Sequence, residues 1–355
     1  MKAAILHELG TPLTIEAVPD PVAGPGEVVV EIAAAPVFSY TNEVFDGTRT
    51  HHLTLPMTPG CGAIGRVRET GPDATRLAPG AWVFCDPTVR ARDDAIAPDI
   101  MLQGWIAPTD GARRLQQWMR AGSFAEQMRV PMECVFPLGD IAPSDASRWC
   151  AAMVMLVPYG GWLASGLQPG ETALVNAATG NFGSAAVAVA LAMGAGTVLA
   201  TGRNEPALAD LVRRFGTRVR PVRLSGDAAA DTACMQAVAA GPIDRVLDIL
   251  PPLPDAAPVR AAAMSVRPNG SVVLMGGLGV DVALPYRWLM RNNITIRGQW
   301  MYPRDAIPRF IALLRSGLLS LDHVDVAEFP LAGINQAIAH AAANAGAFRL
   351  TVLRP

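Results

Sequence analysis

The pattern of hydrophobic and polar positions changes near residue 150. Before it, short strand-like runs alternate with Pro-Gly and Gly-Pro turns, which predicts a β-rich, loop-rich domain. After it, strand-like and helix-like runs alternate, which predicts a doubly wound parallel sheet covered by helices. These later strands are expected over residues 172–177, 197–201, 219–224, 245–249, 271–275 and 294–297. A helix over 306–315 and short strands near 325–329 and 348–353 complete the chain.

A segment of small residues separates the first of the later strands from a helix-like run over 184–193. It reads Ala178-Thr179-Gly180-Asn181-Phe182-Gly183. Small residues suit a dinucleotide phosphate turn, because the pyrophosphate must approach backbone N–H groups at a helix N-terminus. Ala178 replaces the usual first glycine, but the flanking strands and helix complete a βαβ unit. The segment predicts a nicotinamide nucleotide site, with an ordinary tight turn as the alternative.

The end of the second of these strands bears on cofactor choice. NAD sites place an acid there to bind the ribose hydroxyls, whereas NADP sites replace the acid and supply a cation. This chain has Gly202 at that position, followed by Arg203 and Asn204. A guanidinium can bind the 2′-phosphate or stack on adenine. The sequence therefore favours NADPH over NADH, the alternative being a solvated Arg203 and no preference.

Composition narrows the class of protein. At 355 residues two domains are expected. A net charge of −2 without a basic stripe argues against a nucleic-acid partner. The sequence shows neither a signal-peptide pattern at its start nor an apolar run long enough for a membrane span, and its five cysteines form no C-x-x-C pair. We expect a cytoplasmic protein without a membrane partner, acting on a small-molecule substrate.

Several short motifs occur in an order and spacing that is specific when they are taken together. They are Pro25-Gly26-Glu27-Val28, Pro59-Gly60-Cys61-Gly62-Ala63-Ile64-Gly65, Gly80-Ala81-Trp82-Val83, Pro169-Gly170-Glu171-Thr172, the turn over 178–183, and Gly270 with Gly276-Gly277. On these motifs the chain resembles the medium-chain dehydrogenase/reductase (MDR) superfamily, which holds zinc alcohol dehydrogenases and zinc-free quinone reductases.

The resemblance implies an α/β architecture with two domains. Residues 1–149 and 300–355 would form a GroES-like, β-rich catalytic domain, and residues 150–299 a Rossmann dinucleotide-binding domain. Gly276 and Gly277 would lie near the cofactor, and substrate and nicotinamide would meet between the domains. The resemblance also implies a homodimer that pairs through the last Rossmann strand.

The chain departs from the zinc-dependent members at the places of their metal ligands. Those places hold Phe38, Cys61 with Gly62, and a residue near Met153. Catalytic zinc needs three N, S or O ligands from the protein, and Cys61 alone does not supply them. The family's four-cysteine structural zinc lobe is also missing. We therefore expect no zinc, and we do not expect His51-His52 to hold a metal, because adjacent side chains cannot easily share one ion.

An irregular segment over 86–122 occupies the place of that lobe. It contains Met101, Trp105, Trp118 and Met119. The segment is expected to form either a lid or wall of the pocket, or a surface loop or subunit contact that these apolar residues hold in place.

Without a metal, a quinone or enone is an easier hydride acceptor than a simple ketone, because the developing charge spreads over a conjugated system. The resemblance places Tyr40 near the proton-relay hydroxyl of zinc enzymes, so Tyr40 is the preferred proton donor; a pocket-wall role is the alternative. Further candidates supply polar groups or apolar lining. The polar ones are Ser39, Asn42 and Tyr159, and the lining is expected from Phe38, Cys61, Met153 and Trp300.

Three functions follow. The first is a zinc-independent, NADPH-dependent oxidoreductase that transfers hydride to a quinone, enone or other activated double bond. The second is a zinc-free alcohol dehydrogenase or ketone reductase. The third is a non-catalytic, NADPH-binding redox sensor, since a fold alone does not prove activity.

Overall fold

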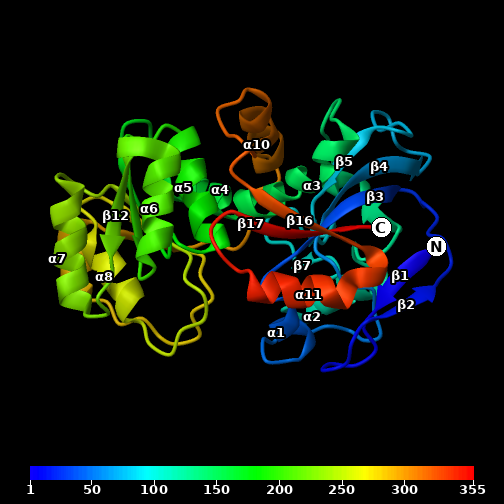
Figure 1. Ribbon diagram of the computed structural model, residues 1–355, viewed down its shortest axis with the longest axis horizontal. Helices are drawn as coiled ribbons and strands as arrows, with labels where there is room; N and C mark the ends of the chain where they lie inside the picture. Colours follow the sequence, from blue (N-terminus) through cyan, green and yellow to red (C-terminus); the bar gives the residue numbers. More distant parts are fainter. The chain divides into compact units, whose positions relative to one another are not determined.

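The computed structural model describes residues 1–355 and divides the chain into two units (Figure 1). The first unit comprises residues 1–153, 324–345 and 349–355, and the second comprises residues 154–323 and 346–348. The predicted fold class is confirmed: one unit is built on a largely antiparallel sheet and the other on a parallel sheet covered by helices. No helix has the length and apolar character needed to cross a membrane.

The second unit contains a six-stranded, all-parallel sheet in the order β12-β11-β10-β13-β14-β15. Its central strands are nearly continuous apolar runs because helices cover both faces of such a sheet. The strands are β10 (Thr172–Asn176), β11 (Thr197–Gly202), β12 (Val219–Arg223), β13 (Arg245–Asp248), β14 (Ser271–Leu274) and β15 (Thr295–Gly298). All six lie within two residues of their predicted positions.

The helices of this unit follow the strands in alternation. They are α5 (Asn181–Ala192), α6 (Glu205–Phe215), α7 (Ala228–Ala239), α8 (Ala257–Ser265), α9 (Tyr286–Asn292) and α10 (Ala306–Arg315), preceded by α4 (Ala151–Ser165), which begins in the first unit. The strand order reverses direction between β10 and β13. Ligands of doubly wound sheets bind at the carboxyl ends of the strands beside this switch point.

The first unit is built around a seven-stranded sheet, in which the chain's last strand returns to pair with β3. Figure 1 shows β16 and β17, in orange and red, beside the blue β3. Six strands run in the order β16-β17-β3-β4-β5-β9, and β8 also pairs with β3. Their bounds are β3 (Glu27–Val37), β4 (Ala63–Thr70), β5 (Trp82–Cys85), β8 (Gln127–Pro131), β9 (Val135–Pro137), β16 (Asp325–Pro330) and β17 (Arg349–Arg354).

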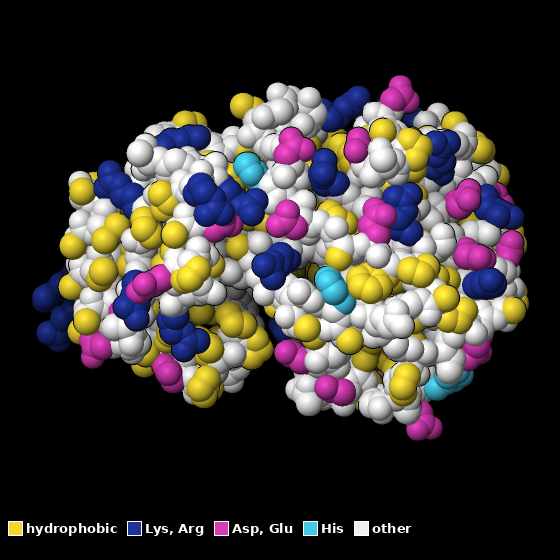
Figure 2. All heavy atoms as spheres, in the orientation of Figure 1, with side chains coloured by type: hydrophobic (Ala, Val, Ile, Leu, Met, Phe, Trp, Pro, Cys, Tyr) yellow, Lys and Arg dark blue, Asp and Glu magenta, His cyan; other side chains and the backbone are white.

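Smaller elements complete the first unit. A hairpin-like pair, β1 (Lys2–Ile5) and β2 (Thr14–Ala17), and a second short pair, β6 (Thr88–Arg90) and β7 (Ile100–Leu102), form two-stranded sheets. The helices are α1 (Thr41–Phe45), α2 (Asp110–Trp118), α3 (Ala146–Trp149) and α11 (Ile334–Ala343). Figure 2 shows Lys and Arg side chains intermixed with Asp and Glu on the visible face, consistent with the small net charge.

The irregular segment over 86–122 is held against the turn at Gly60. The Gly60 N–H donates to the Gly104 carbonyl at 3.1 Å, and the Ser123 N–H donates to the Gly60 carbonyl at 3.2 Å. A β-carbon on Gly104 or Gly122 would collide with the Gly60 carbonyl oxygen. Only glycine permits this close approach of three backbone segments.

The division between the units differs from the predicted one at three places. Residues 150–153 lie in the first unit, and residues 300–323 and 346–348 lie in the second, the longest of these segments being 300–323. The physical reason is packing: Phe310 of α10 lies 5.6 Å from Tyr159 of α4, ring to ring, and Gly160 leaves room for Tyr302. The chain returns to the first unit at Val324, just before β16.

Candidate active site

The predicted phosphate turn connects β10 to α5 in the second unit. Gly180 is the N-cap residue of α5, which begins at Asn181, three residues earlier than expected. A β-carbon on Gly180 would meet nothing within 4 Å, so the helix N-terminus is open. Ala177 has a left-handed φ of +72°, and a β-carbon on Gly183 would collide with its carbonyl oxygen. The turn is therefore tight, and its geometry fits a pyrophosphate.

A buried chain of polar side chains lies at the ends of β10, β11 and β13. The Thr201 hydroxyl is 3.1 Å from Asn176 Oδ1, and Asn176 Nδ2 donates to Asp248 Oδ1 at 2.8 Å. The Ala177 N–H donates to the Thr201 hydroxyl at 3.3 Å. Burial raises the pKa of Asp248 to about 6, against the opposing hydrogen bonds from Asn176 and the Leu250 backbone. This chain of side chains links the switch point to the phosphate turn.

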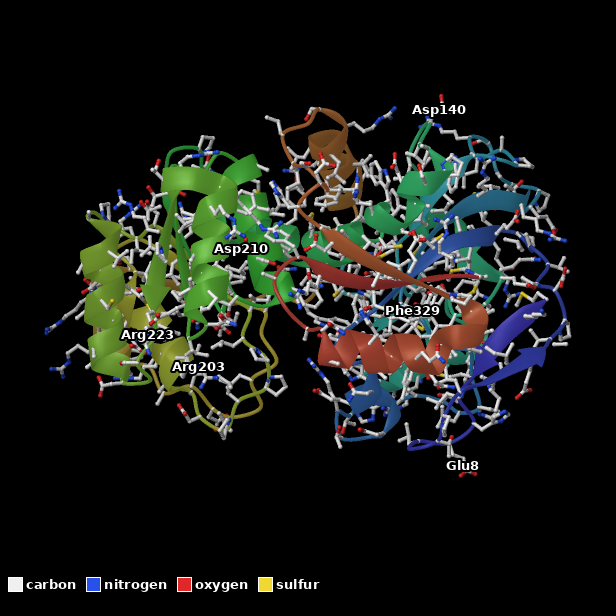
Figure 3. All side chains as sticks on the ribbon, viewed as in Figure 1. Glu8, Asp140, Arg203, Asp210, Arg223 and Phe329 are labelled. Carbon is white, nitrogen blue, oxygen red and sulfur yellow. The ribbon has the colours of Figure 1, made fainter.

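The end of β11 has no room for an acidic side chain. A β-carbon on Gly202 would lie 2.5 Å from Thr179 Cγ2. Arg203 is exposed, whereas the Asn204 side chain caps α6 by accepting from the Ala207 N–H at 3.1 Å. Figure 3 shows Arg203 and Arg223 on the second unit, where Arg223 is ion-paired to Glu205 at 2.7 Å. Arg203 is thus the candidate for a phosphate contact, and Asn204 has a structural role.

The loop after β14 completes this edge of the sheet. A β-carbon on Gly276 would lie 2.8 Å from Asp248 Oδ2, and the Gly277 N–H donates to the Leu250 carbonyl at 2.7 Å. All the predicted cofactor residues therefore lie at the carboxyl ends of four adjacent strands, β11, β10, β13 and β14. Their arrangement fits a dinucleotide.

In the first unit, aromatic side chains enclose Tyr40, the N-cap residue of α1. Phe38 stacks on it with ring centroids 5.7 Å apart and an interplanar angle of 7°. Trp105 lies edge-on to Phe38 at 5.5 Å and to Tyr40 at 5.8 Å. His51 lies 5.7 Å from Trp105. Trp105 is 2% exposed, so the segment over 86–122 supplies a fixed wall of this cluster.

Burial keeps Tyr40, His51 and Cys61 uncharged in this part of the first unit. Burial, followed by the nearby Cys61, raises the pKa of Tyr40, while Arg49 acts in the opposite direction. Burial, followed by the positive charge of Arg49, lowers the pKa of His51 to about 4. Burial also raises the pKa of the Cys61 thiol. At neutral pH the tyrosine keeps its proton, the imidazole is uncharged and Cys61 is a thiol.

The positions of the family's zinc ligands hold a donor set that does not fit zinc. Phe38 offers no lone pair, so the buried Cys61 is the one thiol among these positions. The thioether of Met153 occupies the space beside Gly62, where a β-carbon would lie 2.5 Å from the sulfur. Zinc binds thiolate, imidazole or carboxylate ligands. No group of three or more His, Cys, Asp or Glu side chains is placed to hold a metal ion.

The remaining predicted residues are divided between the two units. Ser39 is half-buried beside Phe38, and Asn42 is exposed on α1. Tyr159 is 4% exposed in the second unit, where it packs on Phe310, and Trp300 is 45% exposed after β15. Of these four, only Ser39 and Asn42 lie in the same unit as Tyr40.

Sequence reasoning missed several residues near these sites. Asn176 and Asp248 are the last residues of two apolar strands at the switch point, and a polar residue in that position was the available signal. Arg49, whose guanidinium lies 4.0 Å above the Tyr40 ring, had no comparable signal.

Comparisons with known proteins agree with this architecture. Residues 24–140 match the alcohol dehydrogenase GroES-like domain, and residues 182–316 match the zinc-binding dehydrogenase family. The chain belongs to the medium-chain dehydrogenase/reductase superfamily. An alcohol dehydrogenase from Moraxella sp. (strain TAE123) is 26% identical over 353 residues, which cover 94% of each chain. With such relatives, the chain is an oxidoreductase of the dehydrogenase type.

Two solved structures show the same fold. A cobalt- and zinc-bound alcohol dehydrogenase from Pyrobaculum aerophilum has a TM-score of 0.78 and 21% identity, covering 100% of this chain and 99% of its own. A protein from Sinorhizobium meliloti 1021, described as a zinc-binding dehydrogenase and bound to NADP, has a TM-score of 0.79 with the same identity and coverage.

Proposed function

We propose that the chain is a zinc-independent, NADPH-dependent oxidoreductase that transfers hydride to an enone, quinone or other activated double bond. The observation that carries this proposal is the donor set at the family's zinc positions, where Phe38, Cys61 and Met153 offer one thiol and one thioether, fewer than the three ligands that catalytic zinc needs. A substrate whose charge spreads over a conjugated system needs less stabilisation than a simple ketone.

The residues of the second unit that would hold NADPH have distinct tasks. The open N-terminus of α5 would bind the pyrophosphate, and Arg203 would contact the 2′-phosphate at the end of β11, where Gly202 carries no acidic side chain. When bound, the reduced nicotinamide supplies a hydride, that is, one proton and two electrons. The chain's own contribution is to bind and orient it.

Tyr40 is the proposed proton donor in the first unit. Hydride addition to the β-carbon of an enone leaves an enolate, and one proton at the α-carbon completes the reduction while NADPH becomes NADP⁺. The phenol keeps its proton at neutral pH because of its buried surroundings. Phe38 and Trp105 fix the plane of the Tyr40 ring by stacking and edge contacts. Solvent would restore the proton after each turnover.

Carbonyl reduction or alcohol oxidation is the second candidate, favoured by relatives that are named alcohol dehydrogenase and sorbitol dehydrogenase. In carbonyl reduction Tyr40 would protonate the alkoxide oxygen instead of a carbon, and in alcohol oxidation the hydroxyl proton of the substrate would leave by the reverse path.

Product analysis with 2-cyclohexenone and NADPH, in the presence of a chelator, distinguishes double-bond reduction from carbonyl reduction. We expect cyclohexanone, formed with equal consumption of NADPH and unaffected by the chelator. Cyclohexenol as the product would establish carbonyl reduction in its place. Activity that the chelator abolishes and zinc restores would contradict zinc independence.

A further inference from the structure

Arg49 occupies an unusual position for a charged side chain. Its guanidinium lies 4.0 Å from the centroid of the Tyr40 ring, and the side chain is only 28% exposed. It donates no hydrogen bond to the protein. Its nearest carboxylate, Glu43, is 3.8 Å away and 48% exposed. A mostly buried guanidinium normally has its five donors paired, because burying an unpaired charge is costly.

Inside the aromatic cluster no group compensates the charge of Arg49, whose ion-pair partner Glu43 is 48% exposed. His51, in the same cluster, is neutral at physiological pH. Its Nδ1 atom is buried and has no hydrogen-bond partner. Cys61 and Tyr40 remain protonated. The cluster therefore places the Arg49 cation, which has only a loose and half-exposed ion-pair partner in Glu43, beside the neutral His51 and the apolar walls of Phe38 and Trp105.

We propose that Arg49, with His51 beside it, binds a carboxylate on the substrate and so selects acceptors that carry one. This inference rests on the proposed function, since it names the substrate class of the Tyr40 site. A planar guanidinium matches a carboxylate with two parallel hydrogen bonds. A single cation suits a monoanion, whereas a phosphate dianion would leave one charge uncompensated.

The arrangement also accounts for the position of Arg49 on the Tyr40 ring. Stacking on an aromatic face holds a guanidinium by cation–π attraction and leaves its edge N–H groups available. Arg49 would thus hold the substrate's distal carboxylate while the conjugated part of the substrate lies near the phenol.

The test compares para-carboxybenzylideneacetone with its methyl ester, which has the same conjugated skeleton and no charge. Binding of each is measured by calorimetry to the NADP⁺-loaded protein, where no turnover occurs. We expect the carboxylate to bind about ten-fold more tightly than the ester. This preference should weaken with added salt, disappear in R49M and be reduced in R49K, which keeps the charge but loses the fork.

Arg66 provides a matched control, because its guanidinium also stacks on an aromatic ring, 4.5 Å from Trp82, in the same unit. R66M should keep the preference for the carboxylate. Equal binding of acid and ester, binding of neither, or a preference that survives in R49M would overturn the inference. A preference that depends on Arg49, without reduction of either probe by NADPH, would uphold the anion site and contradict the proposed reaction.

Discussion

Gly202 and Thr179 exclude a side chain between the ends of two neighbouring strands. A β-carbon on Gly202 would lie 2.5 Å from Thr179 Cγ2 and 3.1 Å from its hydroxyl. Thr179 belongs to the turn after β10, and Gly202 is the last residue of β11. The acid that NAD sites carry at the end of this strand is therefore blocked by the turn itself.

Cofactor selectivity should change only when both residues are replaced. G202D is expected to weaken binding of NADPH and NADH alike by at least about ten-fold, because the new side chain displaces Thr179. In G202D/T179S the methyl group is gone, and we expect NADH binding to recover beyond that of NADPH. Fluorescence titration of both cofactors measures this. If the double variant instead recovered NADPH binding in preference to NADH binding, residue 202 would not be the position that binds the ribose hydroxyls.

Arg203 should account for the preference between the two cofactors. R203M is expected to weaken NADPH binding by about ten-fold through loss of one charge-assisted contact, and to leave NADH binding unchanged. Arg223 is the matched control, because it is exposed on the adjacent strand but already paired with Glu205. R223M should have the smaller effect. Equal losses in the two variants would place the phosphate elsewhere.

Tyr40 should affect turnover and not cofactor binding. Y40F is expected to lower kcat for enone reduction by about a hundred-fold, within the range for loss of a positioned proton donor. Because the pKa of Tyr40 is raised, its protonation should add no decline in activity between neutral and mildly alkaline pH. Stopped-flow measurement of hydride transfer provides both quantities. An unchanged kcat would mean that water donates the proton.

Ionisation of Asp248 should lower the free energy of unfolding of the protein as pH rises. Its pKa is about 6 in the folded protein against 3.8 ordinarily, so the folded state holds the proton more tightly than the unfolded state does. The associated stability is fully present below about pH 4 and is lost as pH rises through about 6. By pH 8 this amounts to roughly 3 kcal/mol. The free energy of unfolding of D248N, relative to that of the native protein, should therefore increase over this range.

Urea unfolding at several pH values measures this difference. N176A is a useful companion variant, because it removes the Asn176 donor and should raise the pKa of Asp248 further. A difference between D248N and the native protein that stays constant with pH would show that Asp248 is ionised normally.

The strands and the parallel architecture followed from the sequence because local pattern determines them. Alternating strand and helix runs located β10 to β15 within two residues. The turn at Gly180 could be read from small residues between a strand and a helix. The order of the family motifs predicted that the C-terminal strand returns to the first unit, and β17 does pair with β3.

What could not be predicted depends on contacts between distant segments. Trp105 lies far along the chain from Phe38 and Tyr40, and only the folded first unit brings them together. The same holds for Arg49, whose role depends on the ring beneath it. The packing of Tyr159 on Phe310 of α10 is a further contact between distant segments that no local pattern predicts.

The glycine contacts at Gly60, Gly104 and Gly122 have a consequence for protein engineering. These contacts hold the backbone next to Trp105 and at the end of the irregular segment. The stretch around Ile96, a residue that is 96% exposed, takes no part in them. Insertions are tolerated best at exposed loop tips. A peptide tag or a small reporter domain can therefore be inserted near Ile96 without shifting the tryptophan, whereas lengthening the chain between residues 104 and 122 would move it.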